Sequence, residues 1–220
     1  MKLDKIILEL KDIEKYYDCS QEKLMELIKK LEQEYRETLV IKNTSDKARL
    51  NVIKKFLCNP ERPILQCYTL FHSKVAFTDG YALYVLNDEY LPFKIASDGK
   101  NTEEVEKMAK EHNLEVEPGV YPYLENIIPD EINAMYNFTV DLKEVLSACK
   151  TQEKDIRGLK PYDLKVNEET VVTIDLLKLE TLIKIMRIKD DFELKYYGEN
   201  RPITYNNNGE MGLILPIRRF

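Results

Sequence analysis

The stretch Val75–Val85, VAFTDGYALYV, joins two β-prone runs through an Asp79-Gly80 pair. Asp-Gly is favoured at the tip of a two-stranded hairpin, because glycine accepts the positive φ that the tight turn requires. The stretch therefore predicts an antiparallel hairpin of Lys74–Thr78 and Tyr81–Leu86. A further strand-like run, Ile64–Phe71, precedes the hairpin and is expected to join the same sheet.

A helix is predicted before these strands, and the same order recurs near the end of the chain. Ser45–Cys58 is amphipathic, and a second apolar helix is expected at Leu176–Ile188. The strands predicted after the second helix are Phe192–Tyr197, Ile203–Asn206 and Gly212–Ile217. The order of one helix and three antiparallel strands thus occurs twice, which indicates a duplicated α+β unit.

Other elements are predicted between and before the two units. Asn101 opens a polar helix that runs to about His112, with Glu104 as its capping-box partner. The later elements are a strand and helix within Phe138–Lys150 and a strand pair at Tyr162–Val166 and Val171–Ile174. Residues 1–43 predict a helical hairpin, interpreted either as a docking arm or, with more weight, as a helical pair that covers its own domain.

Composition narrows the class of protein. The 220 residues are 44% hydrophobic and 33% charged, no run approaches the length of a membrane span, and acidic residues in the first segment argue against a secretory signal. We expect a cytoplasmic protein with no membrane partner. Four cysteines without a CxxC pair and two separate histidines predict reduced thiols and no metal site.

No motif for catalysis or for a cofactor is present. The sequence lacks GxGxxG, GxxxxGK[ST], HExxH and GxSxG, so phosphate loops, zinc-peptidase helices and nucleophile elbows are unsupported. Adjacent acids such as Glu103-Glu104 and Asp190-Asp191 are typical of solvated surface. We therefore expect a protein that is not an enzyme and that uses no cofactor.

Charge is unevenly distributed along the chain. The net charge is −6, which argues against a surface that coats nucleic acid as a whole. Two predicted helices nevertheless carry a net charge of +3 each. Ser45–Cys58 holds Lys47, Arg49, Lys54 and Lys55 against Asp46, and Leu176–Lys189 holds Lys178, Lys184, Arg187 and Lys189 against Glu180. These residues are interpreted either as sequence-independent phosphate contacts or as the wet faces of ordinary amphipathic helices.

Four landmarks follow one another in the order of a known family. They are Arg62-Pro63-Ile64-Leu65 before the hairpin, YPYLENIIP at Tyr121–Pro129, the strand and helix in Phe138–Lys150, and Leu215-Pro216-Ile217-Arg218. The chain resembles the middle and last domains of the bacterial DNA polymerase III β sliding clamp. The resemblance implies an α+β, DNA-clamp-like fold of two tandem domains, residues 44–129 and 130–220, with helices on one face of antiparallel sheets. The helical arm, residues 1–43, stands in place of the family's first domain, and Thr151–Thr170 is too short for every strand of a full last domain.

The resemblance also implies two binding functions. Helices that face duplex DNA would contact its backbone through Lys47, Arg49, Lys54, Lys55, Lys178, Lys184 and Arg187. A groove between the domains would take a hydrophobic clamp-binding peptide of a polymerase or repair protein. Its lining would be Thr78, Gly80, Tyr81, Ala82, Leu83, Pro129, Leu213, Leu215, Pro216, Ile217 and Arg218.

Departures from the family leave alternatives open. Tyr81 and Ala82 stand where the family has His and Arg, which would change the preference of the groove for partners. The same residues could be ordinary strand residues that pack two domains together. The chain could form a homo-oligomeric ring of three two-domain protomers or no ring, and it could be a clamp-derived protein–protein interaction module that never touches DNA.

Overall fold

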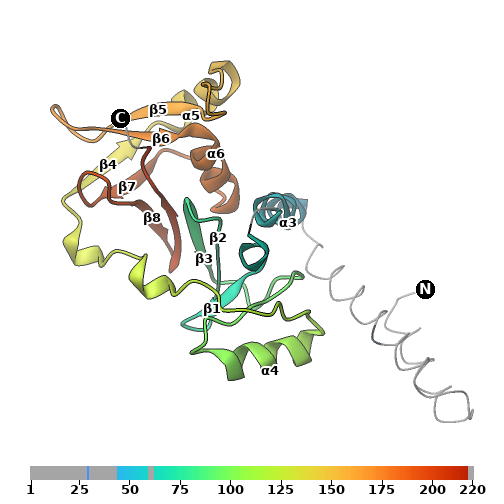
Figure 1. Ribbon diagram of the computed structural model, residues 1–220. Helices are drawn as coiled ribbons and strands as arrows, with labels where there is room; N and C mark the ends of the chain where they lie inside the picture. Colours follow the sequence, from blue (N-terminus) through green and yellow to red (C-terminus); the bar gives the residue numbers. More distant parts are fainter. Residues whose placement is uncertain (1–28, 30–43, 59–61, 218–220) are drawn as a thin grey trace, which may run out of the picture.

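The computed structural model describes residues 29, 44–58 and 62–217 (Figure 1). This part of the chain combines helices with a seven-stranded antiparallel sheet and a separate two-stranded sheet. The predicted α+β class is confirmed. The predicted helical hairpin of residues 1–43 lies outside the described residues.

The first helix-and-strand unit forms largely as expected. It consists of α3 (Thr44–Leu57), β1 (Thr69–Phe71), β2 (Lys74–Thr78) and β3 (Ala82–Leu86). A strand was predicted over Ile64–Phe71, and the prediction is wrong for its first half, because Pro63–Gln66 is a short 3-10 helix, η1. Pro63 is favourable at the start of a helical turn, and the amide of Leu65 donates to the carbonyl of Arg62 at 2.9 Å.

The second unit repeats this order. It consists of α6 (Leu176–Ile185), β7 (Phe192–Tyr196), β8 (Ile203–Asn207) and β9 (Glu210–Ile214). Asp175 begins α6 by accepting a hydrogen bond from the amide of Leu177. The predicted helix and all three predicted strands are present, with boundaries shifted by a few residues.

Strands β3 and β9 join the two units into one sheet. The strand order is β1-β2-β3-β9-β8-β7-β4, and Ala82 pairs with Ile214 while Val85 pairs with Met211. The last strand of each unit therefore meets the other antiparallel at the middle of the sheet. Both proposed domains, residues 44–129 and 130–220, contribute strands to this sheet.

The remaining elements are β4, which is the last strand of the main sheet, the other helical segments, and the two strands of the second sheet. They are α4 (Thr102–His112), η2 (Leu124–Asn126), η3 (Glu131–Asn133), β4 (Tyr136–Val140), α5 (Leu142–Thr151), β5 (Pro161–Lys165) and β6 (Val171–Asp175). Within 151–170 the strand content is β5 alone, and β5 pairs with β6 as a small second sheet.

The capping box predicted for α4 is wrong. Asn101 precedes the helix, but its side chain makes no capping hydrogen bond. The side-chain amide of Asn101 instead donates to the hydroxyl of Thr69 and to the carbonyl of Leu70. Asn101 therefore ties α4 to β1, because the side-chain amide satisfies polar groups on the edge strand rather than the end of its own helix.

Two apolar cores lie on the two faces of the sheet. Alternate residues of β3 take part in different cores: Tyr84 packs with the helices, whereas Leu83 and Val85 pack on the opposite face. This alternation follows from the two-residue period of a strand, and burial on both faces explains why every residue of β3 is apolar and buried.

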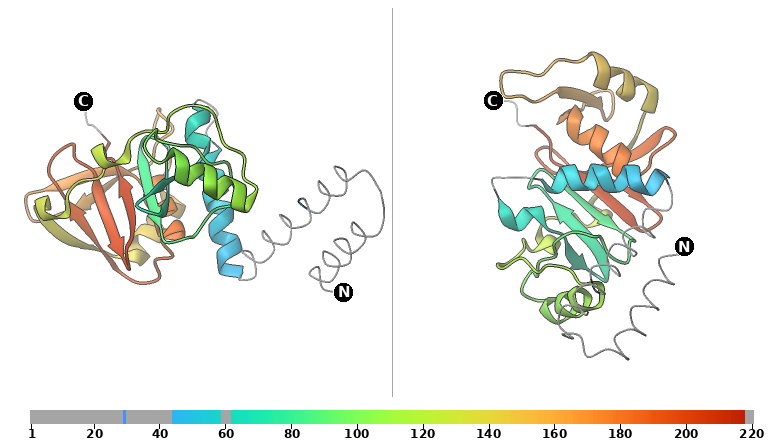
Figure 2. Two further views of the ribbon diagram at one scale, coloured as in Figure 1. Left: turned by 90° about the horizontal axis from the view of Figure 1, so that it is seen from below. Right: turned by 90° about the vertical axis from the view of Figure 1, so that its right-hand side faces the viewer.

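Helices α3 and α6 lie side by side on one face of the sheet (Figure 2). Phe56 of α3 packs edge-on against Phe77 and Tyr84. Helix α6 approaches β9 so closely that a Cβ added at Gly212 would overlap Cδ1 of Leu182. Glycine at this position lets the second helix sit directly on the central strand.

Candidate functional site

The turn between β2 and β3 is held by a network of hydrogen bonds. The amides of Tyr81 and Ala82 each donate to Oδ1 of Asp79 at 2.9 Å, and the hydroxyl of Thr78 donates to the carbonyl of Ala82 at 2.7 Å. Gly80 has φ +90°, which an L side chain rarely adopts. The Asp-Gly pair therefore specifies the turn, and it leaves the Tyr81 side chain 67% exposed.

A buried tyrosine holds the turn against the segment 121–129. The phenol oxygen of Tyr121 accepts a hydrogen bond from the amide of Thr78 at 2.9 Å, while the Tyr121 amide donates to the carbonyl of Ser97 at 2.7 Å. Burial raises the pKa of the Tyr121 phenol, so this group stays neutral. The segment 121–129 is thus anchored beside the hairpin.

A groove of about 170 Å³ lies beside this turn, on the face of the sheet opposite α3 and α6. Its lining is mainly apolar: Arg62, Leu65, Thr78, Gly80, Tyr81, Ala82, Leu83, Pro122, Ile127, Leu213 and Leu215. The structure therefore brings together seven residues of the set predicted for a peptide groove: Thr78, Gly80, Tyr81, Ala82, Leu83, Leu213 and Leu215. Leu65, Leu83 and Leu213 form the buried floor, and Leu215 is partly buried beside them.

Three other predicted groove residues lie outside this lining. Pro129 and Pro216 are half-buried elsewhere, and the amide of Ile217 donates to the carbonyl of Thr173 in β6 at 2.8 Å. The chain leaves the groove after Leu215, because hydrogen bonding to β6 leads it toward the second sheet. Arg218 lies outside the described residues.

Four lining residues were not in the predicted set. Leu65 belongs to η1 and Arg62 directly precedes it, whereas Pro122 and Ile127 come from the segment after α4 that contains η2. The signal for all four was in the sequence, since they lie within RPIL and YPYLENIIP. The sequence did not reveal how this segment lies against the hairpin, which places Ile127 rather than Pro129 in the lining of the groove.

The basic helices meet at a second cavity, of about 440 Å³. It is lined by Val52, Lys55, Phe56, Cys58, Asp79, Lys178, Thr181 and Lys184. Three of the predicted DNA-contacting residues, Lys55, Lys178 and Lys184, are therefore close together. Lys178 forms an ion pair with Asp79, and its ammonium lies 5.7 Å from the ring centre of Phe56.

Arg49 was predicted to contact DNA, but its side chain is buried. Its side chain is 7% exposed and pairs with Asp88 at 3.1 Å and with Glu210 at 3.0 Å. The guanidinium is turned inward to link α3 with β9 and with the segment after β3. A side chain buried in this way cannot reach a phosphate of duplex DNA, so Arg49 is not a DNA-contacting residue.

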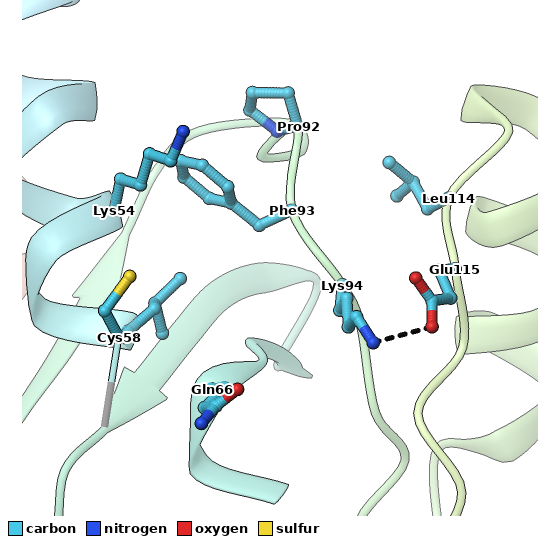
Figure 3. Close-up of a pocket in the computed structure, with 9 residues that line it drawn as sticks. Lys54, Cys58, Gln66, Pro92, Phe93, Lys94, Leu114 and Glu115 are labelled. Atoms are coloured by element: carbon cyan, nitrogen blue, oxygen red, sulfur yellow. Dashed lines mark hydrogen bonds and ion pairs between the residues drawn. The ribbon is translucent and has the colours of Figure 1, made fainter. Parts of the chain in front are cut away.

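The other predicted basic residues differ in position. Lys47 and Lys54 are exposed on α3, and Arg187 is exposed just after α6 with φ 55°. Lys54 does not line the cavity between the helices. It borders a third cavity of about 340 Å³ instead, together with Cys58, Phe93 and Glu115 (Figure 3).

The third cavity offers mixed chemistry. Pro92 and Phe93 form an apolar wall, while Lys94 donates to Glu115 at 2.6 Å and to Glu117 at 3.2 Å. These hydrogen bonds raise the pKa of Lys94, which keeps the ammonium charged and paired. We assign this cavity no role.

The described residues contain no constellation for covalent or metal chemistry. Burial and the charge of Glu117 raise the pKa of the Cys67 thiol to about 11, so it is not a ready nucleophile. No group of three or more His, Cys, Asp or Glu side chains suited to a metal occurs in the part of the chain that the structure covers. Within the same residues, no helix has the length and apolar character needed to cross a bilayer.

Comparison with solved structures identifies the architecture. DNA polymerase III subunit beta from Borrelia burgdorferi, solved in complex with a natural product, matches with a TM-score of 0.52 and 12% sequence identity. The DnaN sliding clamp from Bartonella birtlesii, bound to griselimycin, matches with a TM-score of 0.51 and 14% identity. The chain has the fold of a sliding clamp. The predicted resemblance in fold is thereby confirmed.

The clamp-like fold covers part of those proteins. The matches span 79% and 80% of the present chain, but 63% and 64% of the Borrelia and Bartonella chains. No protein-family model matches the sequence, and no curated protein matches it. The fold is shared at low identity, so activity and partners must be argued from the residues of this chain.

Proposed function

We propose that this clamp-like protein is not an enzyme and acts by binding a short apolar peptide of a partner protein in the groove beside the β2–β3 turn. The observation that carries the proposal is the convergence of Tyr81, Leu213 and Leu215 on one apolar cavity. Their positions also match those that the clamp resemblance assigns to a peptide groove. The griselimycin-bound Bartonella clamp is consistent with ligand binding on this fold.

The lining favours apolar anchors. Leu65, Leu83 and Leu213 are each no more than 2% exposed and form the floor of the groove. Tyr81 is an aromatic residue at the rim, and most of its side-chain surface is exposed to water. A leucine or phenylalanine side chain placed between them would remove apolar surface from water on both sides. An aromatic rim residue also contributes contact area at low entropic cost.

One charged side chain adds orientation. Arg62 is the charged residue among the described residues that line the groove, and it is exposed. Its guanidinium can donate to a backbone carbonyl or a carboxylate of the peptide. The proposed partner is therefore an apolar segment with an acceptor at one end.

The test is a titration with a labelled peptide of the type QLxLF, followed by fluorescence anisotropy. Tyr81→Ala is the main variant, because an exposed residue can be replaced with little effect on folding. We expect the affinity to fall by about tenfold. Leu215→Asp should abolish binding, since it places a charge against the apolar floor.

Ile132→Asp is the matched control, because Ile132 is 89% exposed and does not line the groove. It should bind as the unmodified protein does. Thermal melting of each variant separates loss of binding from loss of fold. If the unmodified protein fails to bind the peptide, the proposal is wrong.

A second candidate function is sequence-independent binding of duplex DNA along α3 and α6. It is favoured by the exposed cations Lys47, Lys54, Lys55 and Lys184 on two neighbouring helices of a chain whose net charge is −6. Phosphate contacts of this kind weaken steeply with salt, whereas an apolar groove does not. The rival is an interaction module that binds the peptide and never binds DNA.

A gel-shift titration of duplex DNA at two salt concentrations distinguishes them. Retention of the duplex at low salt that is lost at high salt supports DNA binding. Light scattering then measures whether the protein forms an oligomer large enough to be a ring. Absence of retention at low salt, with peptide binding intact, favours the interaction module.

A further inference from the structure

The groove beside the β2–β3 turn is small. Its volume of about 170 Å³ is close to that of apolar protein cavities of roughly 150 Å³, which hold one benzene ring. The groove therefore has room for one side chain of the size of leucine or phenylalanine, and the rest of a bound peptide lies along its rim. The groups at the rim decide which kind of peptide can place a side chain there.

The backbone amides around the groove are already used inside the protein. The amides of Tyr81 and Ala82 donate to Asp79. The amide of Gly80 donates to the hydroxyl of Thr78 at 3.0 Å. The other lining amides that donate to carbonyls of the protein, each at 2.9 Å, are those of Leu65, Ile127 and Leu215. An anionic group of a peptide therefore finds no cluster of free amides among these residues.

Arg62 differs from these groups, because its charge is not balanced. It is the charged residue among the described residues that line the groove, and it is exposed. No described residue forms an ion pair with Arg62, and Asp79, the acid of the neighbouring turn, is paired with Lys178. Nη1 of Arg62 lies 3.6 Å from the position that a Cβ at Gly80 would take, so the guanidinium lies against the turn at the rim of the groove.

We propose that the groove takes the free C-terminus of a partner protein, with the last apolar side chain in the groove and the α-carboxylate bound to Arg62. This inference rests on the proposed function, since it names the part of the partner that enters the groove. A carboxylate matches an unbalanced guanidinium, because its two oxygens accept two parallel N–H bonds. A backbone carbonyl in the middle of a chain is neutral and accepts a weaker hydrogen bond.

A terminal residue carries its apolar side chain and its carboxylate on the same Cα. The two groups can therefore reach a groove of this size and the guanidinium at its rim together. An acidic side chain that follows an internal apolar residue is the other source of a carboxylate. That source costs more conformational entropy, because the torsions of the acidic side chain must also be fixed on binding. The terminal carboxylate is the source that we assign.

The experiment is fluorescence anisotropy at constant ionic strength with four peptides of the type QLxLF, each labelled at its N-terminus. They are the free acid, the C-terminal amide, a free acid extended by two glycines, and an amide extended by one aspartate. The free acid should bind about five- to tenfold more tightly than the amide, as expected for a charge-assisted hydrogen bond at an exposed position. Two glycines move the carboxylate by about 7 Å along the chain, so the extended acid should bind like the amide. The amide that ends in aspartate should also bind within about twofold of the simple amide.

Arg62→Gln tests whether this preference comes from the guanidinium. The variant should bind the free acid and the amide with equal affinity, because the charge that distinguishes them is removed. Arg157→Gln is the matched control, since Arg157 is exposed, lies outside the lining of the groove and loses the same charge. It should keep the full preference for the free acid. Thermal melting of both variants checks that they fold.

The outcomes separate this inference from the proposed function. Equal binding of the free acid and the amide by the unmodified protein, or a preference that survives Arg62→Gln, refutes capture of the C-terminus and leaves the groove as a peptide site. Equal binding of the free acid and the amide that ends in aspartate refutes it too, in favour of an internal acidic residue. If the unmodified protein binds none of the four peptides, the proposed function and this inference are both wrong.

Discussion

Lys178 of α6 donates a hydrogen bond to Oδ2 of Asp79, whose other oxygen accepts the amides of Tyr81 and Ala82. One carboxylate therefore connects the two cavities: it lines the cavity between the helices, and it holds the turn that forms one wall of the groove. The helix face and the groove face of the sheet are connected through this ion pair.

Lys178→Met should destabilise the protein and weaken peptide binding. The replacement keeps most of the length of the side chain but leaves the Asp79 carboxylate, which is largely buried, without its cation. We expect the free energy of unfolding to fall by about 2 kcal/mol. A double-mutant cycle with Asp79→Asn, measured by urea denaturation, gives the coupling energy of the pair.

Lys143→Met serves as the control for the cycle, because Lys143 is exposed on α5. It should change stability by less than about 0.5 kcal/mol. Additive effects of Lys178→Met and Asp79→Asn would contradict the link between the two faces.

Arg49→Met should destabilise the protein by about 2 to 4 kcal/mol, because Asp88 and Glu210 would lose the cation between them. Lys47→Met, on the exposed side of the same helix, should have little effect on stability. Thermal or urea denaturation compares the two. Equal stability of both variants would contradict a structural role for Arg49.

Gly212→Ala should destabilise the protein by about 1 to 3 kcal/mol, since the new methyl group would overlap Leu182. Leu182 is 1% exposed on α6, so it has little room to move. Replacing Leu182 by Ala in the same chain should make the added cost of Gly212→Ala smaller, because space is created where the overlap occurs. Equal costs in both backgrounds, measured by urea denaturation, would argue against the contact.

Alkaline pH should destabilise the protein through Cys67. Its thiol has a pKa raised from 9.0 to about 11 by burial, so the folded state disfavours the thiolate. Stability from this group is complete below pH 9 and is lost as the pH rises toward 11, because the unfolded thiol ionises first. Between pH 8 and pH 10 we expect a loss of about 1 kcal/mol.

Cys67→Ala isolates this contribution. The variant will be less stable at every pH, but the fall in its free energy of unfolding between pH 8 and pH 10 should be smaller by that amount. An unchanged pH dependence would show that the thiol ionises equally in both states.

Much of the fold could be predicted because its signals are local. The Asp79-Gly80 turn and the apolar stripe of Leu50, Ile53 and Leu57 are short-range patterns that the structure keeps, and all three core residues are buried. The clamp-like fold was recognised from landmarks spread along the chain. The β3–β9 pairing was not predicted, because strand partners far apart in sequence leave no local pattern.

The groove was predicted in part for the same reason. Tyr81 and Leu215 come together because β3 and β9 pair, and the amide of Leu215 donates to the carbonyl of Tyr81 at 2.9 Å. Pro129 was placed in the lining from sequence order, whereas the three-dimensional register puts Ile127 there. Arg49 was read as a surface cation, because helical spacing gives its direction but not the acids that Asp88 and Glu210 bring from elsewhere.

The position of β9 at the middle of the sheet has a consequence for how the molecule is built. Ala82 pairs with Ile214, and roughly 130 residues lie between them in the sequence. Closing a loop of this length lowers the conformational entropy of the chain before the strand contacts form, and this slows folding. On the ribosome, β1–β3 must wait with an unprotected edge at β3 until almost the whole described chain has been synthesised. Arrival of β9 covers that edge and creates the Leu213 and Leu215 wall in the same event, so a nascent chain acquires its groove only when its sheet is complete.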